Sequence, residues 1–147
     1  MAINPGAVGR TYSSSEPYEV SRVKIREFAE AIGEPSPLCR DREAARAAGY
    51  PDVIAPPTFP IVITATGSGR VTNDPEVGVN YAMVVHGEQN FEHARPLHAG
   101  DVVTWQATIS SIRERAGLTM LTTVTKISTV DGEHVCTATS TLVERGS

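Results

Sequence analysis

The sequence has few of the features of a membrane protein or a nucleic-acid-binding protein. It contains no run of about 18 apolar residues, so it predicts no transmembrane helix. The formal net charge is −4, whereas a nucleic-acid-binding surface is basic. Residues 1–9 lack the charged and apolar regions of a signal peptide. We therefore expect a cytoplasmic protein with neither a membrane nor a nucleic-acid partner.

Cysteine and histidine are also scarce. The two cysteines, Cys39 and Cys136, form no Cys-x-x-Cys pair and fit a reducing compartment, where single thiols behave as small apolar groups. No two of the four histidines are spaced like metal ligands, so we expect no metal and no cofactor. Without a repeat or a low-complexity linker, the 147 residues are expected to form a single domain, residues 1–147, with an ordinary core.

The first half of the chain shows helix signals. Apolar residues at near-helical spacing predict a short helix over residues 20–32, and residues 41–49 are also helix-like. Between them, Gly33 and two prolines predict a loop over residues 33–39. Residues 58–67 are apolar almost all round, and their β-branched content would allow a buried strand. Because Pro56-Pro57 precedes them and Gly67-Ser68-Gly69 follows, we favour a buried helix.

The second half predicts an antiparallel sheet. Strands are expected over residues 81–91, 102–112, 118–130 and 134–143, with a further short strand near residues 10–12. Residues 115–117 supply one turn, and Asp131-Gly132 is a strong hairpin dipeptide. A buried helix followed by such strands indicates an α+β fold in which one face of the sheet is covered.

Two segments resemble the MaoC-like (R)-specific enoyl-thioester hydratases and 3-hydroxyacyl-thioester dehydratases. The loop Gly33-Glu34-Pro35-Ser36-Pro37-Leu38-Cys39 is similar to the Gly-Asp-x-Asn-Pro-x-His loop of these enzymes, in which Asp and His carry out the acid–base chemistry. Gln89-Asn90-Phe91 and the segment from Arg95 to Asp101 are similar to the family's strand and turn after the central helix. The resemblance covers about residues 18–143. It implies a hot-dog fold, an antiparallel sheet wrapped round one helix, that dimerises into a double hot-dog.

The residues that carry the family's chemistry are replaced. Glu34 stands at the Asp position, where its extra methylene displaces the carboxylate, and a misplacement of about 1 Å can cost ~100-fold in rate. Cys39 stands at the His position and cannot reproduce an imidazole. Pro57 lies about where the family has a glycine whose N–H polarises the thioester, and proline has no N–H. Loss of one such donor costs roughly 10²–10³ in rate.

The other candidate residues come from the strand over residues 81–91 and from the start of the central helix. His86 is the best remaining imidazole, with a structural hydrogen-bonding role as the alternative, whereas His93, His98 and His134 are interpreted as surface residues. The resemblance implies substrate contacts for Cys39, Pro57, Thr58, Phe59 and Gln89. A basic cluster could receive an acidic acyl-carrier protein or be a solvated helix face; its members are Lys24, Arg26, Arg40, Arg42 and Arg46.

Three functions follow from this pattern. The leading hypothesis is the substrate-binding subunit of a (3R)-3-hydroxyacyl-ACP or -CoA dehydratase in fatty-acid or polyketide biosynthesis. It resembles the N-terminal, FAS1-like type of actinobacterial subunit, and would be a homodimer alone or a heterodimer with a catalytic MaoC-like paralogue. The second is a self-sufficient homodimeric dehydratase using Glu34 and His86. The third is a protein that binds acyl thioesters without catalysis.

Overall fold

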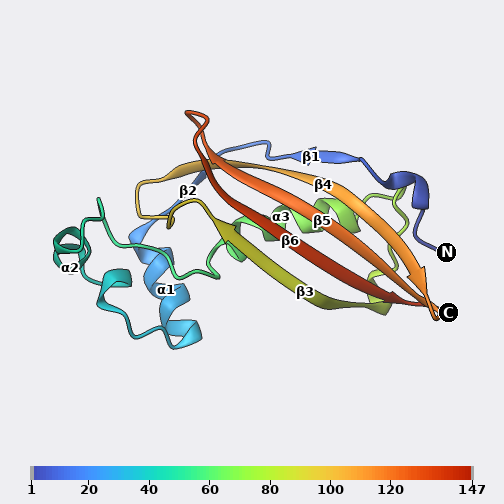
Figure 1. The fold of residues 1–147 in the computed structure, drawn as a ribbon, viewed down its shortest axis with the longest axis horizontal. Helices are drawn as coiled ribbons and strands as arrows, with labels where there is room; N and C mark the ends of the chain where they lie inside the picture. Colours follow the sequence, from blue (N-terminus) through green and yellow to red (C-terminus); the bar gives the residue numbers. More distant parts are fainter. Residues whose placement is uncertain (1, 147) are drawn as a thin grey trace.

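The computed structural model describes residues 2–146 and shows one antiparallel sheet curving round a single long helix (Figure 1). The strands run in the order β1-β4-β5-β6-β3, and β2 also pairs with β4. This is the predicted hot-dog arrangement, and the prediction is confirmed. The strands are β1 (Thr11–Ser13), β2 (Tyr18–Glu19), β3 (Val84–His93), β4 (Val102–Arg115), β5 (Leu118–Thr129) and β6 (His134–Arg145). The helices are η1 (Pro5–Ala7), α1 (Arg22–Ile32), η2 (Pro37–Cys39), α2 (Arg42–Ala47), α3 (Pro60–Thr72) and η3 (Tyr81–Met83).

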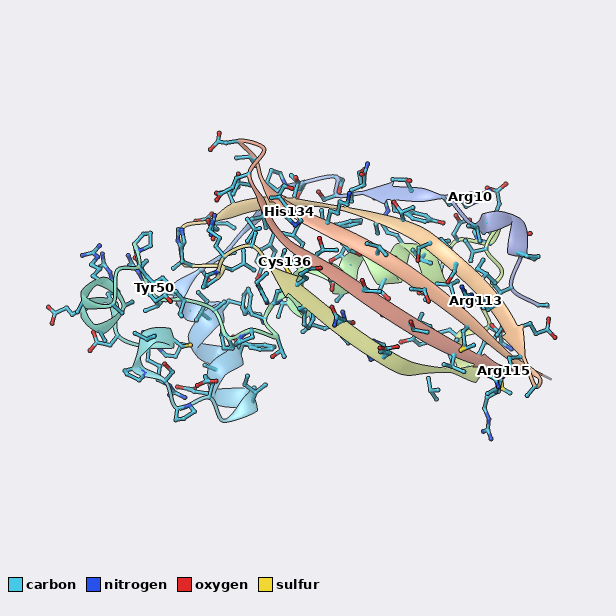
Figure 2. The ribbon with its side chains drawn as sticks, in the orientation of Figure 1. Arg10, Tyr50, Arg113, Arg115, His134 and Cys136 are labelled. Atoms are coloured by element: carbon cyan, nitrogen blue, oxygen red, sulfur yellow. The ribbon has the colours of Figure 1, made fainter. Side chains whose placement is uncertain are left out.

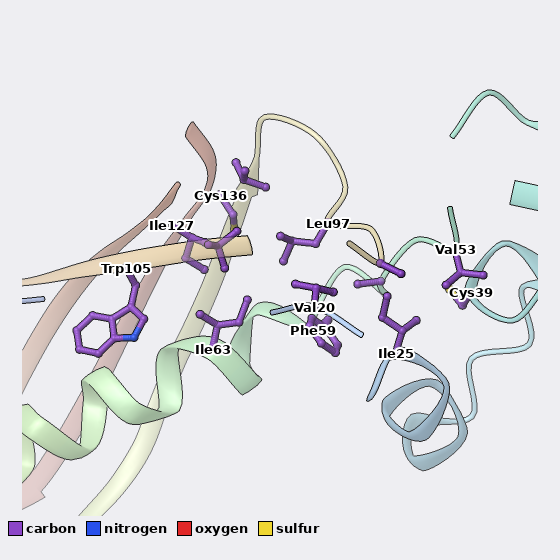
Figure 3. Close-up of a cluster of buried hydrophobic side chains, with 14 of the residues drawn as sticks. Val20, Ile25, Cys39, Val53, Phe59, Ile63, Leu97, Trp105, Ile127 and Cys136 are labelled. Carbon is purple, nitrogen blue, oxygen red and sulfur yellow. The ribbon is translucent and has the colours of Figure 1, made fainter. Parts of the chain in front are cut away.

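The central helix α3 lies against the sheet and is longer at its C-terminal end than predicted. It runs from Pro60 to Thr72, so Gly67 does not end it. A Cβ on Gly67 would lie only 3.0 Å from Cζ3 of Trp105, so glycine at this position allows the indole ring to pack against the helix backbone. Figure 3 shows Trp105 and Ile63 between α3 and the sheet, within the larger of two buried apolar clusters.

Helices α1 and α2 lie beyond one end of the sheet, joined by the loop that resembles the catalytic loop (Figure 1). Both begin at side-chain caps: Ser21 Oγ accepts from Lys24 N at 3.1 Å, and Asp41 Oδ1 accepts from Glu43 N at 2.9 Å. Gly33, with φ of 70°, ends α1 in the left-handed conformation that favours glycine. Both predicted helices are confirmed, with slightly shorter bounds.

Strand β3 begins later than predicted because Tyr81–Met83 form the short helix η3. Its register with β6 shifts between His86 and Glu88, which leaves Gly87 as an extra residue. A Cβ on Gly87 would lie 2.8 Å from Cγ2 of Val143, so only glycine fits without a shift. The bulge places both His86 and Gln89 on the face that α3 covers, opposite Leu142 and Ser140 of β6.

The β4–β5 hairpin turns through Ala116 and Gly117, whose φ values are 53° and 76°. Two left-handed residues in a two-residue loop match the twist of the flanking strands. No helix among residues 2–146 is long and apolar enough to cross a membrane.

Candidate functional site

A pocket of about 430 Å³ opens at the end of the sheet where β3 finishes. We call it the loop pocket. Three segments far apart in the sequence form its walls: the loop after α1, the chain leading into α3, and residues 93–96. Backbone hydrogen bonds join them, because Ile54 N donates to Leu38 O at 2.9 Å and Ala55 N donates to Leu97 O at 2.7 Å. Glu34, Cys39 and Pro57, separated by up to 23 positions, therefore line one pocket.

The loop around Glu34 is ordered by its own polar groups. Ser36 N donates to Glu34 Oε1 at 3.1 Å, and Ser36 Oγ accepts from Leu38 N at 3.3 Å. Arg40 Nη2 donates to the backbone oxygen of Glu34 at 2.9 Å. One carboxylate oxygen of Glu34 thus holds the loop, so this side chain has a structural function as well as a place in the pocket.

Cys39 occupies the His position of the family loop and is only 4% exposed. Burial raises the pKa of its thiol, the carboxylate of Glu34 raises it further, and the nearby Arg40 opposes the shift. The thiol is consequently protonated near neutral pH. It neither exchanges protons as an imidazole does nor offers the thiolate that nucleophilic catalysis requires.

His93 lines the loop pocket, a position that the sequence analysis does not predict. It was interpreted as a surface residue, but its ring is half-buried and lines the loop pocket with Glu34 and Cys39. Its Nε2 lies 2.8 Å from Pro57 O and donates to it, because a carbonyl oxygen only accepts. Nδ1 is buried without a partner among residues 2–146. The alternation of β3 was the available signal, since Gln89, Phe91 and His93 share one face of the strand.

His86 and Gln89 line a different space, a cavity of about 300 Å³ between α3 and strands β3, β5 and β6. We call it the helix cavity. His86 is exposed, and its Nε2 lies 3.1 Å from Ser140 Oγ. Glu34 and His86 of one chain therefore share no pocket. The predicted Glu34–His86 pair is not assembled within a single subunit.

The residues expected to contact substrate divide into three groups. Cys39 and Pro57 line the loop pocket, and Gln89 lines the helix cavity. Phe59 is fully buried and packs edge-on against Phe28, with ring centroids 5.5 Å apart. Thr58 is exposed and lines neither space. Phe59 lies in the buried apolar cluster of Figure 3 and does not line the loop pocket.

The basic cluster of the helical end is largely paired within the chain. Arg42 Nε lies 3.5 Å from Asp52 Oδ2, and Arg40 Nη1 lies 3.7 Å from Glu30 Oε1. The ammonium of Lys24 lies 3.2 Å from Glu27 Oε1. Most of the cluster therefore already has acidic partners, which weakens the case for a carrier-protein docking site. Figure 2 places Arg113 and Arg115 at the opposite end of the sheet from Tyr50, which follows α2.

No cluster of three or more His, Cys, Asp or Glu side chains able to hold a metal ion occurs among residues 2–146. The polar groups of the loop pocket can hold a thioester by hydrogen bonds. Glu34 and His93 are the carboxylate and the imidazole that line this pocket.

Comparison with known proteins agrees with this geometry. Residues 6–138 match the family described as "FAS1-like, dehydratase domain region". A "UPF0336 protein" of Thermobifida fusca is 55% identical over 146 residues, 99% of this chain and 96% of that one. A solved "MaoC-like dehydratase" superposes with a TM-score of 0.89 at 33% identity, over 96% of this chain but 43% of that longer chain. The truncated HadBC (3R-hydroxyacyl-ACP dehydratase) complex of Mycobacterium tuberculosis gives a TM-score of 0.85 at 29% identity, over 93% and 96%. The chain belongs to the FAS1-like dehydratase family and has the hot-dog fold of the MaoC-like dehydratases.

Proposed function

We propose that this chain is the substrate-binding subunit of a (3R)-3-hydroxyacyl-thioester dehydratase, acting on acyl-ACP or acyl-CoA in fatty-acid or polyketide chain building. The loop pocket holds the thioester, and a second chain supplies the acid–base groups. The observation that carries this proposal is a pocket of about 430 Å³ that brings together Glu34, Cys39 and Pro57, the three positions at which the resemblance implies that catalytic groups are replaced.

Dehydration of a 3-hydroxyacyl thioester requires three kinds of group. A base removes the α-proton, an acid protonates the leaving hydroxyl, and a donor stabilises the charge that develops on the thioester oxygen. Glu34 already accepts a hydrogen bond from Ser36 N, and Cys39 is a buried thiol with a raised pKa. Pro57 has no N–H to donate. The pocket thus lacks a complete set of catalytic groups.

The free edge of the sheet supports a partner chain. Strand β3 is ten residues long and pairs with β6 on one side only, among residues 2–146. An unpaired edge of this length is a template for another strand, and pairing two such edges satisfies both. The related HadBC protein is a complex. We infer a homodimer for the isolated chain and a heterodimer with a homologous subunit that has an intact Asp–His loop.

A mixing experiment tests the proposal. Hydration of crotonyl-CoA is measured with the purified chain alone, with an Asp–His homologue alone, and with the two co-expressed. The expected result is no turnover by this chain and a faster or broader activity for the pair than for the homologue alone. Robust turnover by the isolated chain that Glu34→Gln abolishes would reject the proposal. Tight thioester binding with no effect on the homologue would instead indicate a binding protein without a catalytic partner.

One observation favours a second candidate, a self-sufficient dehydratase. Glu34 and His93 line the same pocket, and the donation from His93 Nε2 to Pro57 O leaves Nδ1 as the one nitrogen able to accept a proton. This candidate predicts a bell-shaped pH profile for the isolated chain. It also predicts that His93→Gln abolishes turnover while His86→Gln, which alters the helix cavity, does not. Equal effects of the two substitutions would argue against it.

A further inference from the structure

The helix cavity includes in its lining several polar side chains that a channel for a plain alkyl chain would not need. It lies between α3 and the inner face of the sheet, and none of its lining residues belongs to the loop pocket. Besides Thr72, whose hydroxyl bonds within α3, three threonines line it: Thr64 comes from α3, and Thr123 and Thr125 come from β5. They are 7%, 8% and 5% exposed.

The hydroxyls of these three threonines have no hydrogen-bond partner among residues 2–146. Other threonine hydroxyls are paired: Thr72 Oγ1 donates to Gly69 O at 3.2 Å, and Thr122 Oγ1 lies 3.1 Å from Thr141 Oγ1. Within the same range, the one side-chain nitrogen or oxygen that is both fully buried and unpaired is His93 Nδ1. The three hydroxyl oxygens are therefore not fully buried. A ligand in the cavity could contact them.

An alkyl chain in this cavity would leave the hydroxyls without partners. A buried hydroxyl that loses water and gains no hydrogen bond is unfavourable. Valine has nearly the shape of threonine without the hydroxyl and would line an alkyl channel at no such cost. A ligand with oxygen atoms at matching positions avoids the penalty, because a hydroxyl both donates and accepts.

Further polar groups line the cavity beside the threonines of β5. Gln89 contributes an amide from β3, and the His86–Ser140 pair contributes an imidazole and a hydroxyl. Ile61, Ala65 and Leu142 supply apolar surface between them. Such a mixture fits a carbon chain with several oxygen substituents.

The helix cavity lies along β3 from the loop pocket. Gln89 lies four residues before His93 on the same face of β3, which corresponds to about 13 Å at the rise of a strand. On the other wall, Ile61 follows Pro57 by four residues at the start of α3. A thioester held in the loop pocket would thus extend its acyl chain along β3 toward the cavity.

We propose that the helix cavity binds the distal part of an acyl chain bearing hydroxyl or keto groups beyond carbon 3, of the kind that a chain-extending synthase leaves partly reduced. The substrate class is therefore an oxygen-substituted acyl thioester. This inference rests on the proposed function, because the thioester end must occupy the loop pocket.

Calorimetric titration with a matched pair of ligands tests the inference. The two probes are tetradecanoyl-CoA and a tetradecanoyl-CoA carrying hydroxyls at carbons 9 and 11, far enough along the chain to span the roughly 13 Å between the two spaces. With the wild-type chain, the dihydroxylated probe is expected to bind at least about fivefold more tightly, the effect of one or two net hydrogen bonds. In the Thr123→Val/Thr125→Val variant the preference is expected to disappear or reverse.

Thr122→Val is the matched control, because Thr122 lies on the same strand with its hydroxyl paired to Thr141 on the outer face. It is expected to leave the ratio of the two affinities unchanged. The melting temperature of the double variant is expected to equal or exceed that of the wild type, which shows that it folds. Equal binding of both probes, with no change in the double variant, overturns this inference and leaves the proposed function standing. Binding of neither probe to the wild-type chain overturns both.

Discussion

Asp52 shows how a single buried carboxylate holds the helical end of the molecule next to the loop pocket. It is 7% exposed and accepts from Arg22 Nε at 3.0 Å, from Arg22 Nη2 at 2.8 Å and from Val53 N at 2.8 Å. The hydrogen bonds from Arg22 hold the pKa of the Asp52 carboxyl well below its usual range, and Val53 N and Arg42 contribute although burial opposes the shift. The residue therefore joins α1 and α2 to the chain that leads into α3.

Asp52→Asn is expected to lower the free energy of unfolding by about 1–2 kcal/mol at pH 7, a value reduced because Arg22 is half-exposed. The folded-state pKa is depressed, so the contribution of Asp52 is complete above the unfolded-state pKa of about 4. It is lost as the pH falls below about 4. Urea unfolding at pH 7 and at pH 3 measures the difference, which should shrink at the lower pH. Glu27→Gln, in the exposed pair with Lys24, is the control and should change stability by less than about 0.5 kcal/mol.

The two cysteines should be unreactive in the folded chain. Burial raises the pKa of the Cys136 thiol to about 11 and also raises that of Cys39. Since the thiolate is the reactive form, a disulfide reagent at pH 7.5 should modify neither cysteine at an appreciable rate until denaturant is added, when both should react. The absorbance of the released thiol measures this. Rapid labelling of Cys39 in the native protein would mean that its thiol takes part in the chemistry of the pocket.

At the scale of elements, α3 and the sheet meet where Trp105 packs on Gly67. Gly67→Ala places a methyl group 3.0 Å from the indole ring, and the resulting strain is expected to lower the free energy of unfolding by about 1–3 kcal/mol. Gly69→Ala, two residues along the same helix, has no atom within 4 Å of the new Cβ. It should be neutral or stabilising by up to about 1 kcal/mol. Thermal unfolding of the two variants makes the comparison, and equal destabilisation would show that helix propensity, and not the indole contact, governs this position.

The sequence predicts the long elements correctly and misplaces two of their boundaries. Alternation identified the four long strands, and the dipeptide Asp131-Gly132 lies in the β5–β6 turn as expected. The end of α3 was placed too early because a glycine inside a helix is indistinguishable from a stop signal until its tertiary neighbour is known. The residues 81–83 were assigned to a strand because a single 3₁₀ turn has no period of its own.

Only the part of the site that lies within one short segment could be predicted from the sequence. The loop over residues 33–39 resembles a family motif, so Glu34 and Cys39 were identified directly. His93 was not, because its place in the pocket depends on the pairing of β3 with β6 and on the turn into α3. The alternation of β3 puts His93 on the same face as Gln89 and Phe91, but which face is the inner one depends on tertiary pairing and on the bulge at Gly87.

At the scale of the whole molecule, the outer edge of β3 is expected to be the dimer interface. Ala94 N donates to Val135 O at 2.8 Å, in register with the β3–β6 ladder. Because N–H groups alternate along an antiparallel strand, those of Glu88 and Asn90 also point to β6, whereas those of Gln89 and Phe91 point to the free edge. Loss of an N–H that points to β6 should therefore affect folding of the chain, whereas loss of one that points to the free edge should affect dimerisation.

Gln89→Pro removes a donor from the free edge and leaves the ladder with β6 intact, since proline is tolerated at edge strands whose N–H faces outward. We expect the wild-type chain to be a dimer by light scattering and Gln89→Pro to raise its dissociation constant at least about tenfold, with a cooperative unfolding transition retained. Glu88→Pro is the contrasting variant: it removes an N–H that faces β6 and should lower the unfolding temperature of the chain itself. A wild-type monomer at micromolar concentration, or an equal loss of folding in both variants, would show that this edge does not form the interface.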